Sequence, residues 1–91
     1  MSSIVLPERF DFSYHTTFTE HYTKILAESG SDLILVDFAK VSYLDSSALG
    51  MLVLLNKKAA AKNRKVAIAN ARGTAMEVLR IANFDKVFEF K

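Results

Sequence analysis

The apolar positions of this 91-residue chain include two short, nearly continuous runs, residues 33–38 (LILVDF) and 66–69 (VAIA). Runs of this length are typical of strands that are covered on both faces, as in the middle of a parallel sheet. The segment between them, residues 46–62, is long enough for a helix and suits a right-handed crossover between parallel strands. Together the three segments predict a β-α-β unit.

Apolar residues at helical spacing extend this alternation on both sides. One stripe predicts a helix over residues 13–28, and another predicts a helix that begins near Thr74. Thr17 with Glu20, and Thr74 with Glu77, have the spacing of capping boxes, in which side chains satisfy the first free amide groups of a helix. The sequence therefore offers a candidate capping box for each of these two helices.

Two further strands are expected near the ends of the chain. Residues 4–10 predict a strand that is interrupted or bordered by Pro7, because proline cannot donate to a central ladder. Residues 87–90 predict a closing strand. The resulting order, β-α-β-α-β-α-β, indicates an α/β layer fold with a mostly parallel sheet and helices packed on it. The length suits a single domain with one core.

Composition and charge restrict the classes of protein that fit. Twelve basic and ten acidic side chains leave a formal charge of +2, which is too small an excess to indicate a polyanionic partner. The absence of cysteine excludes disulfides, thiolate metal sites and cysteine nucleophiles. The sequence has neither the pattern of a signal peptide nor an apolar run of membrane-spanning length, so we expect a cytoplasmic protein that does not bind membranes.

The segment YLDSSALG, residues 43–50, places an acid and two hydroxyls between a strand and an apolar helix. In an open α/β sheet this junction lies at the edge where functional groups usually gather. Asp45 or Ser46 has the right chemistry to cap the helix, and capping alone is the structural interpretation. In the functional interpretation, Ser46 carries a phosphoryl group that faces the first amide groups of the helix.

The predicted helix carries apolar groups on every side of its first two turns, whereas a helix lying on a sheet buries only one stripe. These apolar residues run from Ala48 to Leu55. Either neighbouring helices cover the second face, or a partner covers an apolar patch beside Ser46. In the second case a phosphate would add about −1.5 to −2 charges at the rim of the docking surface, where repulsion and desolvation oppose binding.

Three segments, residues 35–38 (LVDF), 41–44 (VSYL) and 45–50 (DSSALG), resemble the phosphoacceptor region of STAS domains of the anti-sigma-factor antagonist type. In that family an apolar strand and a short turn lead into Asp-Ser-Ser/Thr-Gly/Ala-Leu-Gly at the start of a helix. The resemblance covers nearly the whole chain and implies one STAS domain over residues 1–91.

Two smaller elements also resemble the family. Arg9-Phe10-Asp11 is similar to its Arg-Leu-Asp element, and Asn83-Phe84 is similar to the segment before its last strand. The family usually opens with a hairpin of two strands before the Arg-Leu-Asp element, whereas only eight residues precede Arg9. We therefore expect a STAS-like fold with a shortened N-terminal hairpin.

The resemblance implies roles for individual residues. Ser46 matches the serine that a partner kinase phosphorylates, and Asp45 and Ser47 match its acidic neighbour and the second hydroxyl. The implied function is regulatory and non-enzymatic, with no cofactor: the unphosphorylated form binds an anti-sigma factor, often itself a serine kinase, and a serine phosphatase of the PP2C type restores that form. Candidates for the docking face, with core packing as their alternative role, are Val41, Ser42, Tyr43, Leu44, Ala48, Leu49 and Met51.

A second interpretation has the chain as a constitutive STAS-like structural subunit of a larger transporter-associated or signalling complex. Ser46 would then be only a helix cap. The two interpretations share the fold and differ in whether Ser46 is modified.

Other motifs indicate weaker alternatives. His21 and Lys24 have the His-x-x-Lys spacing of histidine phosphotransfer domains, but those domains are helical bundles. His15 and His21 do not share a helical face as a metal-binding pair would, so no metal site is expected. Without a Gly-x-Ser-x-Gly elbow or a glycine-rich phosphate loop, no catalytic site is expected. Five basic residues within 57–65 lack interleaved aromatics, so nucleic acid is not expected as a partner.

Overall fold

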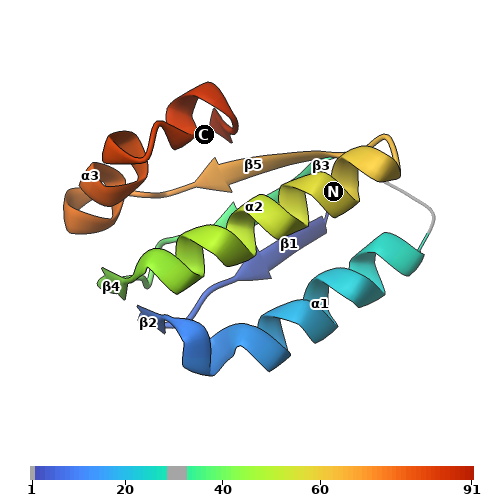
Figure 1. Ribbon diagram of the computed structural model, residues 1–91, viewed down its shortest axis with the longest axis horizontal. Helices are drawn as coiled ribbons and strands as arrows, with labels where there is room; N and C mark the ends of the chain where they lie inside the picture. Colours follow the sequence, from blue (N-terminus) through green and yellow to red (C-terminus); the bar gives the residue numbers. More distant parts are fainter. Residues whose placement is uncertain (1, 29–32) are drawn as a thin grey trace.

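The computed structural model describes residues 2–28 and 33–91 of the chain. Its centre is a parallel sheet of four strands in the order β1-β3-β5-β6 (Figure 1). The two apolar runs of the sequence form the central strands β3 and β5, which confirms the predicted parallel sheet. The strands are β1 (Ser2–Val5), β3 (Leu33–Asp37), β5 (Lys65–Ala69) and β6 (Glu89–Phe90).

Three α-helices occur in the described part of the chain, α1 (His15–Ala27), α2 (Ser46–Ala61) and α3 (Gly73–Ile81). Figure 1 shows α1 and α2 running in the same direction across one face of the sheet. Short 3₁₀ turns at Phe12–Tyr14 and Phe84–Lys86 precede α1 and follow α3. The predicted α/β layer fold is therefore confirmed. None of the helices in this part of the chain is long and apolar enough to cross a membrane.

A second sheet of two parallel strands lies at the end of the first. It consists of β2 (Arg9–Phe10) and β4 (Tyr43–Leu44), with Arg9 paired to Tyr43 and Phe10 to Leu44. Neither strand was predicted as a separate element, because two residues are too few to show a period. In the described residues, β1 pairs only with β3 and in parallel, so no antiparallel hairpin precedes α1.

Pro7 divides the strand that the sequence predicts over residues 4–10. The chain leaves the main sheet after Leu6, whose amide donates to the Asp37 carbonyl at 3.1 Å. Proline has no amide with which to continue the ladder. The carbonyl of Glu8 then accepts hydrogen bonds from the segment that leads into β4. The proline thus transfers the chain from one sheet to the other.

The two candidate capping boxes are both wrong. Thr17 lies inside α1, and the turn before α1 is capped instead by Asp11, whose carboxylate accepts hydrogen bonds from the amide and hydroxyl of Ser13. Thr74 lies inside α3, whose first residue, Gly73, has a φ of +58°. Glycine adopts this left-handed conformation at little cost, so backbone geometry rather than a side-chain cap begins α3.

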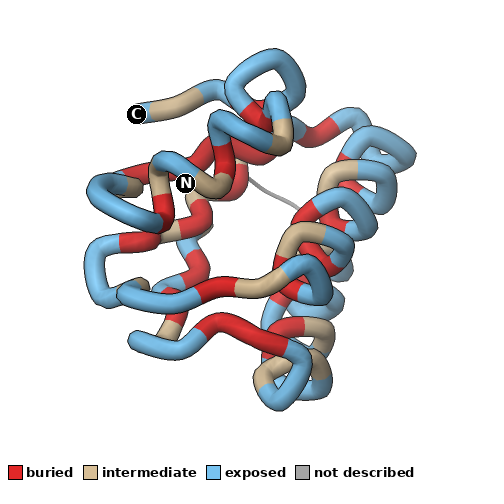
Figure 2. Tube along the Cα trace, turned by 60° about the vertical axis from the view of Figure 1, so that its left-hand side comes forward, coloured by how far each residue is buried: buried red, intermediate tan, exposed pale blue. Residues whose placement is uncertain are grey.

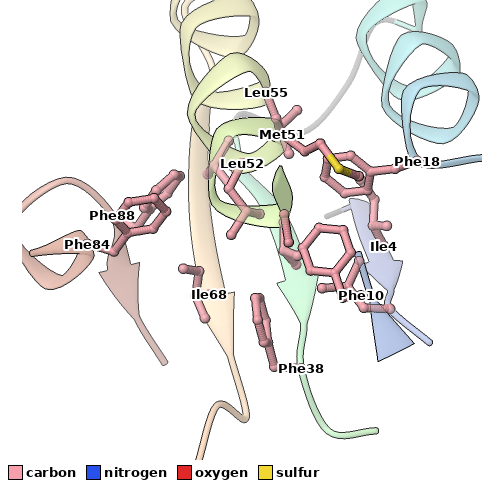
Figure 3. Packing of buried hydrophobic residues seen from close by; sticks show 14 of the residues in the cluster. Ile4, Phe10, Phe18, Phe38, Met51, Leu52, Leu55, Ile68, Phe84 and Phe88 are labelled. Carbon is pink, nitrogen blue, oxygen red and sulfur yellow. The ribbon is translucent and has the colours of Figure 1, made fainter. Parts of the chain in front are cut away.

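One cluster of buried apolar side chains lies between the sheet and the helices (Figure 3). Figure 2 shows buried positions interspersed with exposed ones along the chain, whereas in the central strand β5 four of the five residues are buried. The Phe10 ring contacts those of Tyr14, Phe18 and Phe38, at centroid distances of 6.1, 5.3 and 6.1 Å. Offset and edge contacts of this kind add to the stabilisation from burial. α2 contributes one buried stripe, Ala48, Met51, Leu52, Leu55 and Ala59.

Leu54 and Leu55 offer a matched test of this core, because they are adjacent leucines of α2 in opposite environments. Leu55 is fully buried, whereas Leu54 is 41% exposed. Leu55→Ala should lower the free energy of unfolding by about 2–5 kcal/mol, since it removes buried methyl groups and leaves a cavity. Leu54→Ala should lower it by about 1 kcal/mol or less. Urea denaturation followed by circular dichroism measures both, and equal losses would contradict the orientation of α2.

Candidate functional site

The YLDSSALG segment lies at the edge of the molecule where the parallel strands end. β4 ends at Leu44, Asp45 continues in an extended conformation, and α2 begins at Ser46. β2 runs beside β4, so the start of α2 lies close to the turn that follows β2 (Figure 1). This edge is the one at which the sequence predicted functional groups.

Asp45 caps α2. Its Oδ1 accepts a hydrogen bond from the amide of Ala48 at 2.9 Å, and so satisfies one of the free amide groups of the first turn. Ser46 and Ser47 are both exposed on that turn. Of the two residues that the sequence proposed as the cap, Asp45 has this role, and the side chain of Ser46 is accessible from solvent at the helix start.

Arg9 and Asp11 form a second polar group at this edge. The Nε of Arg9 donates to Oδ2 of Asp11 at 2.6 Å, and the guanidinium carbon lies 4.3 Å from the centre of the Tyr43 ring. Hydrogen bonds from Ser13 and Arg9 hold the pKa of the Asp11 carboxyl below its usual value. The hydrogen bond to Asp11 in turn raises the pKa of the Arg9 guanidinium. The Arg-x-Asp element therefore forms an ionised pair beside β4.

Asp37, at the end of β3, is held in a similar way. Its Oδ1 accepts hydrogen bonds from the amide of Ala39 at 2.9 Å and from the side-chain amide of Asn70 at 3.1 Å. The bonds from Asn70 and Ala39 keep the pKa of its carboxyl below the usual value. Asp11, Asp37 and Asp45 thus all accept hydrogen bonds that order the chain where β2, β3 and β4 end.

A shallow groove of about 260 Å³ lies between the start of α1 and the first turns of α2, where Ser47, the neighbour of Ser46, contributes to its lining. We call it the α1–α2 groove. Phe12 is 66% exposed and stacks on His15, with ring centroids 5.3 Å apart. Apolar surface near the start of α2 is therefore left uncovered by the described residues, as the second of the two alternatives from the sequence required. The lining residues are Phe12, His15, Ser47, Gly50, Met51 and Leu54.

Four of the predicted docking residues lie at or near the surface. Ser42 and Tyr43 are exposed, whereas Val41 and Leu49 are half-buried and pack against the core. Tyr43 is the largest exposed side chain among them, and the Arg9 guanidinium lies over its ring. These four residues remain candidates for the docking face.

The other three predicted docking residues are buried. Leu44 and Ala48 belong to the core, because β4 and the first turn of α2 turn these positions toward the helix–sheet interface, so they are core residues rather than surface contacts. Met51 is also buried, but it contributes to the lining of the α1–α2 groove. The predicted docking residues did not include Phe12 and Leu54, which are both exposed. Strand alternation would place Phe12 on the same face as the buried Phe10, so no local signal in the sequence marked it as exposed.

One of the five basic residues within 57–65 is buried, and the other four are exposed. Arg64 is buried, and its Nη1 donates to the carbonyl of Ile25 near the end of α1 at 2.6 Å. Lys58 lies in the last turn of α2, where a positive charge is favourable to the helix dipole. Arg64 and Lys58 therefore have structural roles at the ends of α1 and α2.

A family model for the STAS domain matches residues 3–91. The chain belongs to the STAS domain family. Among curated proteins, it is similar to the STAS-domain containing protein PA14_20770 of Pseudomonas aeruginosa (strain UCBPP-PA14), with 36% identity over 87 residues. The similarity covers 96% of this STAS domain and 84% of that protein.

Solved structures with a similar fold include proteins described as anti-sigma factor antagonists. TM1081 of Thermotoga maritima, described as a candidate antagonist, has a TM-score of 0.80 and 18% identity, covering 97% of this chain and 77% of that one. The antagonist SpoIIAA in its unphosphorylated form has a TM-score of 0.68 and 17% identity, covering 93% and 86%. These likenesses confirm the STAS-like fold.

Removal of the Asp45 cap should destabilise the STAS domain. Asp45→Ala leaves the Ala48 amide without its partner, so the free energy of unfolding should fall by about 0.5–2 kcal/mol. Asp45→Asn keeps an oxygen that can accept the same hydrogen bond and should lose less. Thermal melts of the three chains measure the difference. If the asparagine chain were as unstable as the alanine chain, the charge of Asp45 would matter more than its hydrogen bond.

A substitution at Gly50 should stabilise the domain rather than destabilise it. It lies at an exposed position of α2, and an added Cβ would meet no atom within 4 Å. Glycine inside a helix is less favourable than alanine by roughly 0.5–1 kcal/mol. Gly50→Ala should therefore raise the free energy of unfolding by about that amount, as measured by urea denaturation. A less stable alanine chain would show that the groove has no room for the methyl group.

Proposed function

We propose that this STAS domain, residues 1–91, is a non-enzymatic anti-sigma factor antagonist whose binding is switched by phosphorylation of Ser46. The unphosphorylated form binds an anti-sigma factor, which is itself a serine kinase or acts with one, and the phosphorylated form releases it. A PP2C-type serine phosphatase restores the binding form. The exchange takes place in the cytoplasm and involves no cofactor.

The position of Ser46 is the observation that carries this proposal. A kinase needs an accessible hydroxyl, and Ser46 is exposed on the first turn of α2. A protein partner needs uncovered apolar surface, and the α1–α2 groove with Phe12 and Leu54 supplies it next to that turn. The fold that the chain shares with TM1081 and SpoIIAA supports the same class of function.

Asp45 also bears on the choice between the two interpretations of Ser46. In the structural interpretation Ser46 is retained as a helix cap. Asp45 accepts the capping hydrogen bond from Ala48, so capping does not account for the hydroxyl at position 46. This observation supports modification, rather than capping, as the role of the Ser46 hydroxyl.

Phosphorylation would weaken binding through electrostatics. The phosphate adds about −1.5 to −2 charges beside Asp45, at a surface that a partner must desolvate. A loss of about 1–3 kcal/mol in binding free energy lowers affinity by about five- to 150-fold, which is enough to switch a complex at cellular concentrations.

Paired baits test the switch. Ser46→Ala removes the phosphoacceptor and should retain the partner from a native lysate, whereas Ser46→Asp places a permanent charge at the rim and should recover at least several-fold less. Thr23→Asp, an exposed position near the other end of α1, is the matched control and should recover as much as the alanine chain. Quantitative mass spectrometry of the captured proteins measures the ratios.

Direct phosphorylation separates the switch from a constitutive subunit. With ATP and a kinase encoded beside the protein, intact-mass analysis should show the gain of one phosphate on the unsubstituted chain and none on Ser46→Ala. Equal recovery by the alanine and aspartate baits, together with no gain of mass, would contradict the switch and favour the structural subunit.

A further inference from the structure

Arg9 lies on the strand that pairs with the segment leading to Ser46. β2 and β4 run in parallel, with Arg9 directly opposite Tyr43. Neighbouring strands are about 4.8 Å apart, and three residues of extended chain span at most about 11 Å. The long side chain of Arg9 and a phosphate on Ser46 can therefore meet without any change in the backbone.

The ion pair with Asp11 turns Arg9 in the required direction. Asp11 lies two residues after Arg9, and β4 continues in that same direction from Tyr43 to Asp45 and Ser46. The hydrogen bond from Nε to Asp11 at 2.6 Å therefore draws the guanidinium toward the Ser46 end of the strand pair. Asp11 contributes most to the raised pKa of Arg9, and the charge of Asp45 also contributes, so Arg9 already lies within the field of the residue before Ser46.

The guanidinium has hydrogen-bond donors to spare. Arginine carries five N–H groups in a planar fork, and the contact with Asp11 uses the one on Nε. The Arg9 side chain is 67% exposed and rests on the Tyr43 ring, which leaves its terminal nitrogens open to a second acceptor. A planar pair of N–H groups suits two oxygens of one phosphate.

We propose that Arg9 binds the phosphate of phosphorylated Ser46, in an ion pair that joins β2 to the start of α2. This inference rests on the phosphorylation of Ser46 in the proposed function. The pair holds the phosphate beside the Tyr43 ring, which is 43% exposed and is a candidate docking residue. Phosphorylation then alters the docking face at Tyr43 as well as at the α1–α2 groove.

Phosphoserine installed at position 46 during translation tests the pair without any kinase. The second pKa of the phosphate, ordinarily about 6, is read from the pH dependence of its ³¹P NMR signal. A guanidinium favours the dianion and lowers this pKa, so Arg9→Gln should raise it by about 0.5–1 unit relative to the unsubstituted chain. Lys40→Gln removes one exposed positive charge from the loop after β3 and should raise it much less. Asp11 and Asp45, the acidic groups near Arg9, are unchanged in both variants.

A second readout needs no substitution. The Nη hydrogens of an exposed arginine exchange rapidly with water, whereas those held by a phosphate exchange slowly enough for ¹⁵N NMR. The Arg9 Nη signals should be observed in the phosphoserine chain and not in the unmodified chain.

The proposed ion pair would be contradicted if Arg9→Gln and Lys40→Gln changed the second pKa of the phosphate equally, or if no new Arg9 Nη signal were observed in the phosphoserine chain. Either result leaves the switch at Ser46 to act through repulsion alone. Conversely, a chain that no kinase phosphorylates would contradict the proposed function and leave the measured Arg9 pair intact.

Discussion

The parallel pairing of β2 with β4 is the constraint on which the site depends. Side chains on a strand alternate between its two faces. On one face Phe10 and Leu44 enter the core, and on the other the Arg9 guanidinium lies over Tyr43. The same backbone register therefore fixes both the aromatic core and the polar edge. Because β4 leads directly into Asp45, it also determines where α2 begins.

α2 combines a core stripe with an apolar surface that the described chain leaves uncovered. Leu55 and its buried neighbours on α2 hold the helix on the sheet, while Phe12 and Leu54 remain solvated beside the α1–α2 groove. Solvated apolar groups add little to stability, and a glycine within a helix lowers it. Gly50 and the exposed apolar residues therefore disfavour the isolated domain slightly. Under the proposed function, a protein that packs closely against the groove would bury these apolar residues and so offset this cost.

The main sheet and the start of α2 could be predicted from the sequence because each depends on a local signal. Continuous apolar runs mark β3 and β5, and the change from apolar strand to Asp45 and Ser46 marks the helix start. The pairing of β2 with β4 could not be predicted in this way, because each strand has two residues and finds its partner far along the chain. A local pattern carries no information about such a contact.

The exposure of side chains near the start of α2 was harder to predict than the fold, for a related reason. Leu44 and Ala48 are apolar residues close to Ser46 in the sequence, and were therefore candidates for contact with a partner. The chain between β4 and α2 directs both side chains into the core instead. Conversely, Phe12 resembles a core residue and lies outside because the turn after β2 reverses its direction. The capping box predicted at Thr17 does not form, because the helical turns begin earlier in the chain, after Asp11, which caps them. Side-chain direction near a junction depends on the turn, and composition alone does not specify the turn.

The neighbouring hydroxyls of Ser46 and Ser47 differ in a way that favours Ser46 as the switch. Successive residues of a helix are rotated by about 100°, and Ser47 faces the α1–α2 groove. A phosphate on Ser47 would lie against the apolar side chains of that groove, where desolvation opposes the charge even in the free protein. Ser46 is exposed and is not among the residues that line the groove, so a phosphate at this position would remain in contact with solvent. A reversible switch requires that the free protein tolerate both states, and of these two serines Ser46 fits the proposed switch better, because it is exposed and is not part of the groove lining.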